Sequence, residues 1–460
     1  MCRARCSSRS GPARCSARPL RVAAWSSPAQ PSTSQCGGTE VAGEGCAARG
    51  LRAVQPAQGA ASRARANAHS PLHGPFAPPP CSSGAKGSMR IALIADELTP
   101  AHGWGRYATE VARALVQRGA KVRLLSPRRL CEDKELARLP GHVHVSSFRS
   151  ETRGLLKVTV RNLPAAWRAL RGCEVVHALT EPYAPLAALC ARSAAVVVTV
   201  HGTYGPRLLA GTQGLLQRWA LRRAAYVVCV SRYTERVMQQ ALPGLRTVVV
   251  PNGVDIARFQ HLPTGPAQCA IPDGPFVLSV GALKERKGYH VSIPAFALAQ
   301  QQFPDLRYVI AGSVEDRPYV ARLQALAREL GVEQKIIFAG RVSDDDLVRL
   351  YHRCVAFWQL PTASEGQFEG FGLMYLEANA CGKPVIGTRG CGAEEPIIDG
   401  YNGFLVPPDD PAAAAAALCR LLEDPDLAQA MGEHGRRRAQ ECTWETTACR
   451  LLELYSSVVR

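Results

Sequence analysis

The pattern of apolar and polar residues becomes regular at Met89 and predicts short buried strands separated by amphipathic helices. A first helix is predicted at Arg106–Arg118, because Tyr107, Val111 and Leu115 share one face and a glycine follows the last turn. The strands predicted in this half are Arg90–Ala95, Lys121–Ser126, Val175–Leu179, Ala195–Val200, Tyr226–Val230 and Thr247–Val250. Such alternation is typical of a parallel sheet covered by helices on both faces.

The same alternation restarts after a turn-rich segment, Pro251–Pro275. Its predicted strands are Phe276–Val280, Arg307–Ala311, Lys335–Ala339, Val355–Leu360 and Pro384–Gly387, and an amphipathic helix is predicted at Trp444–Val459. The pattern therefore predicts an α/β protein with two Rossmann-like, doubly wound domains, at residues 89–255 and 256–460. Ligands of such sheets bind at the carboxyl ends of the strands, so we expect a ligand held between the two domains.

Residues 1–88 show no hydrophobic periodicity and contain 11 Lys or Arg residues but only two acids, Glu40 and Glu44. A segment of this composition cannot bury enough apolar surface to offset the entropy of ordering, so we expect a disordered N-terminal extension. Its Arg- and Ser-rich composition also fits an organelle transit peptide. An upstream extension is equally compatible, because Met89 directly precedes a natural first strand.

The net charge of +17 is unevenly distributed. Between Arg113 and Arg171 there are 14 Lys or Arg residues against four acids, which indicates either a face for an anionic membrane or phosphorylated acceptor, or a solvated face. The longest apolar runs have the length of strands, so a membrane-spanning helix is not expected. The 17 cysteines form no set with zinc-ligand spacing, and most lie in apolar segments, so we expect a reducing, cytoplasmic location and no structural metal.

The segment EGFGLMYLEANACGKPVIGT, residues 369–388, carries the clearest chemistry. Glu369 is predicted in a loop and Glu377 on the helix that follows, while Gly370 and Gly372 let a ligand approach the start of that helix. The free amides and the dipole of a helix start favour a phosphate. This layout fits a sugar–diphosphate–ribose, although a solvated loop acid and a helix-surface acid would give the same spacing.

This E-x7-E block resembles the signature of retaining glycosyltransferase family 4, and the resemblance runs from Met89 to the C-terminus. It implies the GT-B fold, in which two Rossmann-like domains face a cleft, and we expect the last helix to pack back on the N-terminal domain. It also implies that Glu369, Gly370, Phe371, Gly372, Leu373 and Glu377 contact the sugar donor.

The segment SVGALKERKG, residues 279–288, resembles the diphosphate loop of the family. Lys287 matches the lysine that neutralises the donor phosphates, whereas Ala282 stands where the family usually has an arginine. Arg286 or Lys284 is a candidate for the missing charge. The resemblance also implies that a loop near Arg341 and Val342 borders the nucleotide base.

Two N-terminal segments resemble the family as well. AHGWGRYATE, residues 101–110, places Gly103 and Gly105 at a helix start, where the donor phosphates or the acceptor can come close. VTVHGTYG, residues 198–205, places His201 at a strand end, and the resemblance implies that it faces the transferred sugar. The catalytic residues expected from the resemblance are thus His201, Lys287 and Glu369.

The predicted reaction is transfer of a sugar from a UDP- or GDP-sugar to an acceptor hydroxyl, with retention at the anomeric carbon. Glycans, polysaccharides, lipid-linked sugars and glycolipids are all compatible acceptors. We expect no cofactor and no metal, and we interpret Ser343 as a helix N-cap followed by acids that favour the helix dipole.

Three alternatives remain open from the sequence. A GT-B nucleotide-sugar epimerase or a phosphorylase would share the architecture. A nicotinamide-dependent dehydrogenase is disfavoured, because the third glycine of its fingerprint would fall at Ala108. A non-catalytic basic protein that binds membrane or nucleic acid would not explain residues 369–388. We expect peripheral contact with an anionic membrane as an addition to the enzyme, and no specific nucleic-acid partner.

Overall fold

The computed structural model describes residues 89–99, 103–127, 134–139, 142–147, 154–363 and 367–459. The predicted N-terminal extension, residues 1–88, lies outside these residues. Ten cysteines belong to the described part, and the structure places none of these ten in a disulfide. No described helix is both long enough and apolar enough to cross a membrane.

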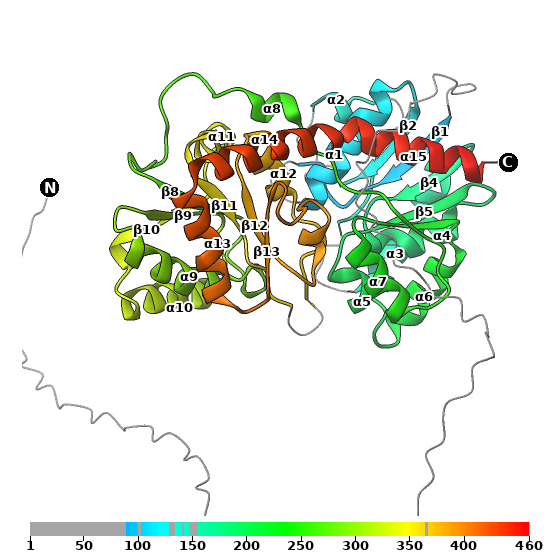
Figure 1. Cartoon of the computed structure of the whole chain (residues 1–460). Helices are drawn as coiled ribbons and strands as arrows, with labels where there is room; N and C mark the ends of the chain where they lie inside the picture. The colour runs from blue at the N-terminus through cyan, green and yellow to red at the C-terminus, as the bar shows by residue number, and fades with distance from the viewer. Residues whose placement is uncertain are drawn as a thin grey trace, which may run out of the picture. The chain divides into compact units, whose positions relative to one another are not determined.

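The first half of the chain forms a seven-stranded parallel sheet in the order β3-β2-β1-β4-β5-β6-β7 (Figure 1). Its strands are β1 Arg90–Ile94, β2 Lys121–Ser126, β3 Val143–His144, β4 Val175–Ala178, β5 Ala195–Val200, β6 Tyr226–Cys229 and β7 Thr247–Val249. The helices in this half are α1 Gly103–Gln117, α2 Lys134–Ala137, α3 Leu155–Ala169, α4 Ala184–Cys190, α5 Tyr204–Arg207, α6 Gln213–Arg223 and α7 Arg232–Ala241.

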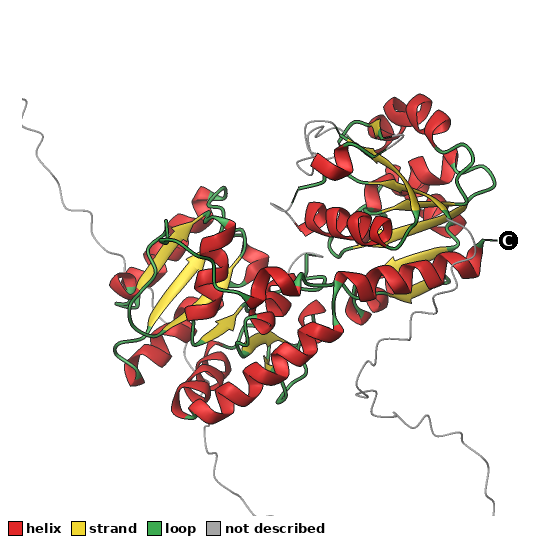
Figure 2. Ribbon diagram, turned by 90° about the horizontal axis from the view of Figure 1, so that it is seen from above, coloured by secondary structure: helices red, strands yellow, loops and turns green. Residues whose placement is uncertain are grey.

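The second half forms a six-stranded parallel sheet in the order β10-β9-β8-β11-β12-β13. The strands of the structure are yellow in Figure 2. Its strands are β8 Phe276–Val280, β9 Arg307–Ala311, β10 Ile336–Gly340, β11 Ala356–Trp358, β12 Val385–Thr388 and β13 Gly403–Val406. The helices are α8 Ile256–Gln260, α9 Tyr289–Gln302, α10 Arg317–Glu329, α11 Asp344–Arg353, α12 Leu373–Ala380, α13 Pro411–Glu423, α14 Pro425–Glu441 and α15 Trp444–Val458.

Both sheets have the doubly wound strand order, which confirms the predicted pair of Rossmann-like domains. In each sheet the order reverses direction in sequence between two central strands, β1 and β4 in the first and β8 and β11 in the second. Loops after these strands open at one edge of the sheet, which is where doubly wound sheets bind ligands. The predicted domain boundaries themselves stay a prediction.

The predicted strands are all present with ends shifted by at most two residues, because most of them are largely apolar and buried in the core. Two strands were missed. β3 has only two residues, and β13 follows the turn of a segment, GYNGFLV, in which polar and apolar residues are mixed.

Helix α15 packs against α1 of the first half. Trp444, Leu451 and Tyr455 are buried in one core with residues of α1 and the first sheet. Its Tyr455 hydroxyl also lies 2.6 Å from Nδ1 of His177 on β4. The chain therefore returns to its first sheet after completing the second.

Candidate functional site

Glu369 lies in the loop before α12 and is the centre of a buried charge cluster. Its Oε2 accepts hydrogen bonds from Nζ of Lys287 at 2.5 Å and from Nη1 of Arg286 at 3.1 Å. Burial opposes ionisation of Glu369, but the charges of Lys287 and Arg286 outweigh it and lower the pKa of Glu369 to about 2. The structure thus brings together two predicted residues, Lys287 and Glu369, and adds Arg286.

Lys287 is only 6% exposed and ends the 3-10 turn Glu285–Lys287 after β8. Burial lowers the pKa of its ammonium group, and the neighbouring Glu369 acts in the opposite direction. An ammonium group has three N–H donors and Glu369 takes one, so further acceptors can be bound. Ala282 is partly buried in the preceding loop and Lys284 is exposed, so it is Arg286 that stands beside the cluster.

The glycines of the 369–372 loop are required by close backbone contacts. A side chain at Gly370 would place Cβ 1.8 Å from the carbonyl oxygen of His201, and Gly372 has a left-handed φ of 87° at the start of α12. The Gly370 carbonyl accepts a hydrogen bond from the Ser231 hydroxyl at 2.6 Å. Thr203 binds the neighbouring Phe368 backbone, so the loop is held by the first half of the chain.

Glu377 lies on α12, is only 5% exposed and binds two side chains that the sequence analysis did not single out. Its Oε1 accepts a hydrogen bond from Nη1 of Arg106 on α1, and its Oε2 accepts one from the Tyr351 hydroxyl at 2.9 Å. The hollow lined by Arg106 and Glu377 measures about 20 Å³, which is room for about one water molecule. A larger group that binds Glu377 must therefore displace Arg106.

The His201 ring is partly buried and contacts a backbone carbonyl and an aromatic ring. Its Nε2 lies 2.8 Å from the Leu179 carbonyl, which can only accept, so Nε2 carries the proton. The ring also meets the edge of Tyr107 at a centroid distance of 4.6 Å. Burial lowers the pKa of His201 to about 4, so the ring is neutral at physiological pH and Nδ1 is its remaining acceptor.

Glu181, just after β4, was missed by the sequence analysis. Its side chain is fully buried, and its Oε1 accepts a hydrogen bond from the His201 backbone amide at 2.7 Å. Its Oε2 has no hydrogen-bond partner among the described residues. Burial raises the pKa of Glu181 to about 7. The signal available in the sequence is an acid that directly follows an apolar strand.

The remaining predicted donor contacts are more dispersed. Gly105 packs on the Thr99 backbone, where a Cβ would lie 2.3 Å from the carbonyl oxygen, whereas nothing lies within 4 Å of a Cβ at Gly103. Arg341 and Val342 follow β10 at the edge of the second sheet, and Arg341 pairs with Glu315 at 3.2 Å. Phe371 is buried and Leu373 partly buried in the core around α12.

The acids at the start of α11 have structural partners. Ser343 is the N-cap, as interpreted from the sequence, and accepts a hydrogen bond from the Asp346 amide. The Asp346 carboxylate is 1% exposed and accepts hydrogen bonds from the Gln268 and Cys269 amides and from Arg349. These contacts account for Asp346 without a metal ion.

Two doubly wound domains with a buried lysine–carboxylate cluster before a glycine-flanked helix define a glycosyltransferase of the GT-B class. Solved structures share this fold. Sucrose-phosphate synthase from Thermosynechococcus elongatus aligns with a TM-score of 0.64 at 22% identity over 80% of this chain and 98% of that chain. Anabaena Alr3699/HepE, solved in complex with UDP and glucose, aligns with a TM-score of 0.64 at 21% identity over 80% of this chain and all of that chain.

Sequence comparisons agree with the fold. The family model "Glycosyltransferase Family 4" matches residues 101–258, and "Glycosyl transferases group 1" matches residues 266–438. A GDP-mannose-dependent alpha-(1-6)-phosphatidylinositol monomannoside mannosyltransferase of Mycolicibacterium smegmatis is 34% identical over 60% of this chain and 74% of its own length. The chain therefore belongs to glycosyltransferase family 4.

A second relative is matched over less of its length. The D-inositol 3-phosphate glycosyltransferase of Corynebacterium urealyticum is 37% identical over 225 residues, which are 46% of this chain and 51% of that protein. The chain thus spans about half the length of this relative.

Proposed function

We propose that the protein transfers a sugar from a nucleoside-diphosphate sugar to an acceptor hydroxyl with retention at the anomeric carbon. The observation that carries the proposal is the Lys287–Glu369–Arg286 cluster beside the glycine-flanked start of α12, with Glu377 on the same helix. Two cations and a helix start can stabilise a departing diphosphate, and fixed charges of this kind contribute strongly to catalysis.

The residues around the start of α12 have distinct roles in this proposal. The diphosphate is bound by Lys287, Arg286 and the amides of residues 370–372. Glu369 accepts a hydrogen bond from a hydroxyl of the sugar, and Glu377 accepts hydrogen bonds from the ribose hydroxyls. The bond between the anomeric carbon and the phosphate oxygen breaks, and the acceptor oxygen bonds to the same face. The acceptor proton goes to the departing phosphate, so no carboxylate nucleophile and no metal ion is needed.

The state of Glu377 supports a donor-induced change. Arg106 and Tyr351 already hold its carboxylate, so the ribose must displace Arg106 before both hydroxyls can bind. Because Arg106 comes from α1 and Glu377 from α12, donor binding would also break a contact between the two domains.

The 34%-identical relative is named for GDP-mannose and for a phosphatidylinositol mannoside, so GDP-mannose and a glycolipid acceptor are the first candidates for this chain. Glycan, polysaccharide and lipid-linked acceptors stay open. The cytoplasmic location, peripheral contact with an anionic membrane and the targeting role of residues 1–88 also stay predictions.

The test is nucleotide release by the full-length protein from GDP-mannose, UDP-glucose, UDP-N-acetylglucosamine and UDP-galactose, each with and without EDTA. We expect slow hydrolysis of one donor, unchanged by EDTA and lost in Lys287→Met. An isomerised donor would indicate an epimerase, and phosphate-dependent release of sugar phosphate a phosphorylase. Absence of release together with no thermal stabilisation by GDP or UDP would overturn the proposal.

A further inference from the structure

Helices α3, α4 and α6 cover one face of the first sheet, and their inner sides belong to a single core with it. Their outer sides are unusually apolar. Of the twelve large apolar side chains exposed among the described residues, six lie on these three short helices. They are Leu156 (56% exposed), Val160 (55%), Trp167 (46%), Leu189 (39%), Leu215 (67%) and Trp219 (42%).

These side chains form stripes rather than isolated spots. On α3, Leu156, Val160 and Trp167 are four and seven residues apart, which places them on one side of the helix. On α6, Leu215 and Trp219 are four residues apart. Exposed apolar groups that gather in this way mark an interaction surface, whereas scattered ones do not.

The same layer is positively charged. From Leu155 to Thr234 the sequence has ten Lys or Arg residues and two acids, Glu174 and Glu181. Glu181 is fully buried, and Glu174 binds Arg90 on β1. No acid lies on α3, α4 or α6. Exposed bases on or just after these helices are Lys157, Arg161, Arg168, Arg171, Arg192, Arg222 and Arg223.

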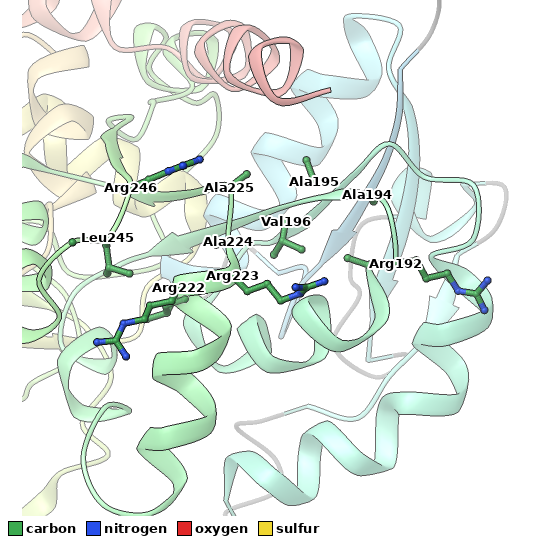
Figure 3. A pocket seen from close by; sticks show the side chains of 13 residues that line it. Arg192, Ala194, Ala195, Val196, Arg222, Arg223, Ala224, Ala225, Leu245 and Arg246 are labelled. Atoms are coloured by element: carbon green, nitrogen blue, oxygen red, sulfur yellow. The ribbon is translucent and has the colours of Figure 1, made fainter. Parts of the chain in front are cut away.

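A surface hollow of about 450 Å³ lies where α4 and α6 end, at the amino ends of β5 and β6. Four arginines contribute to its lining, namely Arg192, Arg222, Arg223 and Arg246, and the other lining residues are uncharged. Figure 3 shows Arg192 and Arg222 on opposite sides of it. The Arg192 guanidinium also stacks over Trp167 at 4.2 Å, which joins the hollow to the apolar stripe of α3.

We propose that this α3–α4–α6 face docks on the surface of a membrane that contains anionic phospholipids. Trp167 and Trp219 enter the headgroup layer with the neighbouring leucines, the exposed bases meet the lipid charges, and the arginine-lined hollow takes a lipid phosphate. Interfacial binding combines buried apolar area with attraction between basic side chains and anionic lipids, and this face offers both.

A nucleic acid fits the face less well. Phosphate backbones are bound by basic and polar groups, and they leave exposed Leu and Val side chains in water. Moving the exposed apolar side chains of α3 out of water lowers the free energy, and docking on a bilayer surface removes them from water. The proposal deepens the membrane contact stated under the proposed function and does not depend on the identity of the donor.

The test is co-sedimentation of the full-length protein with vesicles of phosphatidylcholine, alone or with about 30% phosphatidylglycerol. Each basic residue near an anionic leaflet contributes about a factor of five to binding. We therefore expect at least tenfold tighter binding to the anionic vesicles and at least a tenfold loss in Arg222→Glu/Arg223→Glu. A matched control, Arg322→Glu/Arg328→Glu, reverses two exposed charges on α10 and is expected to bind like the wild type.

Quenching of tryptophan fluorescence by brominated lipids is a second measurement, which reports directly whether Trp167 and Trp219 enter the bilayer. Brominated lipids should quench the wild type more than Trp167→Phe/Trp219→Phe, because Trp358 and Trp444 are buried and any quenching of Trp25 and Trp104 is common to both proteins. Equal binding to both vesicle types, equal loss in the α10 control, or displacement of bound protein by duplex DNA at matched ionic strength would overturn the docking proposal. Donor hydrolysis is measured on the same samples, so a docking variant that still hydrolyses the donor separates this result from the proposed function.

Discussion

Replacing Glu181 by Gln should change how the stability of the protein depends on pH. The carboxylate is fully buried, and its Oε1 accepts a hydrogen bond from the His201 amide. Glutamine keeps an acceptor at this position but cannot ionise. Because burial raises the pKa of Glu181 from an ordinary 4.5 to about 7, the folded protein binds this proton more tightly than the unfolded chain.

The sign and size of this pH dependence of stability follow from the linkage between proton binding and folding. An acid with a raised pKa contributes its full stability below pH 4.5, and that contribution is lost as the pH rises toward 7. The difference between 4.5 and about 7, at about 1.4 kcal/mol per tenfold change in proton affinity, gives a total loss of about 3 kcal/mol. Most of this loss falls between pH 5 and pH 8.

Two histidines, His177 and the partly buried His201, act in the opposite direction. Burial lowers the pKa of His177 to about 3 and that of His201 to about 4, so their contribution is present above pH 6.5 and is lost as the pH falls. The stability of the wild type alone therefore mixes both effects. The difference between the wild type and Glu181→Gln at each pH isolates the carboxylate.

The assay is urea unfolding of both proteins at pH 5, 6, 7 and 8, followed by tryptophan fluorescence. We expect Glu181→Gln to gain on the order of 2 to 3 kcal/mol of stability relative to the wild type between pH 5 and pH 8. The control is Glu174→Gln, at a partly exposed acid that pairs with Arg90, for which the difference should stay constant. A Glu181→Gln difference that changes by less than about 0.5 kcal/mol over this range would refute the reasoning.

Three further predictions concern the donor site. Lys287→Met leaves Glu369 buried without its closest cation, so it should cost about 3 kcal/mol of stability and abolish most donor hydrolysis. The double variant Lys287→Met/Glu369→Gln should recover stability in urea unfolding but should not recover hydrolysis. Arg106→Gln frees Glu377 from a competing cation and should tighten GDP or UDP binding about tenfold by calorimetry. Gly370→Ala places a methyl group 1.8 Å from a carbonyl oxygen and should lower both the melting temperature and the rate of donor hydrolysis.

Each of these predictions has a contrary outcome. Stability that stays low in the Lys287→Met/Glu369→Gln double variant would mean that the cost is not an unpaired charge. Weaker nucleotide binding by Arg106→Gln would mean that Arg106 contacts the donor itself. Gly274→Ala is the control for Gly370→Ala, because a Cβ at Gly274 meets only the Asp305 carbonyl oxygen, at 3.9 Å. Equal loss of activity in both glycine variants would contradict the role given to the backbone contact.

The fold was predictable because most of its strands are runs of apolar residues in the sequence. The run Ala195–Val200 is buried on both faces of the first sheet, and no other local structure suits it as well. A two-residue strand such as Val143–His144 has no such signal, since it exists only through pairing with β2. Short elements that depend on a neighbour cannot be read from local sequence.

The candidate site was predictable only in part. Lys287 and Glu369 were singled out by motif, and the structure brings them within hydrogen-bond distance. The partner of Glu377 was not predictable, because Arg106 lies 271 residues away and the pair forms only when two domains meet. His201 lies at the end of a strand, as expected, and its Nε2 contacts the Leu179 carbonyl. Its role toward the transferred sugar stays a prediction.

The return of α15 to the first sheet has a consequence for synthesis on the ribosome. The first sheet is translated early, but the core on its α1 side includes Trp444, Leu451 and Tyr455. Until those residues emerge, the apolar surface of α1 is open to water and the His177 ring lacks its tyrosine partner, 278 residues further along. The core of the first domain therefore stays incomplete while the second domain is translated, and its exposed apolar surface is prone to non-native contacts during that time. A chaperone that holds nascent chains would find its binding surface there.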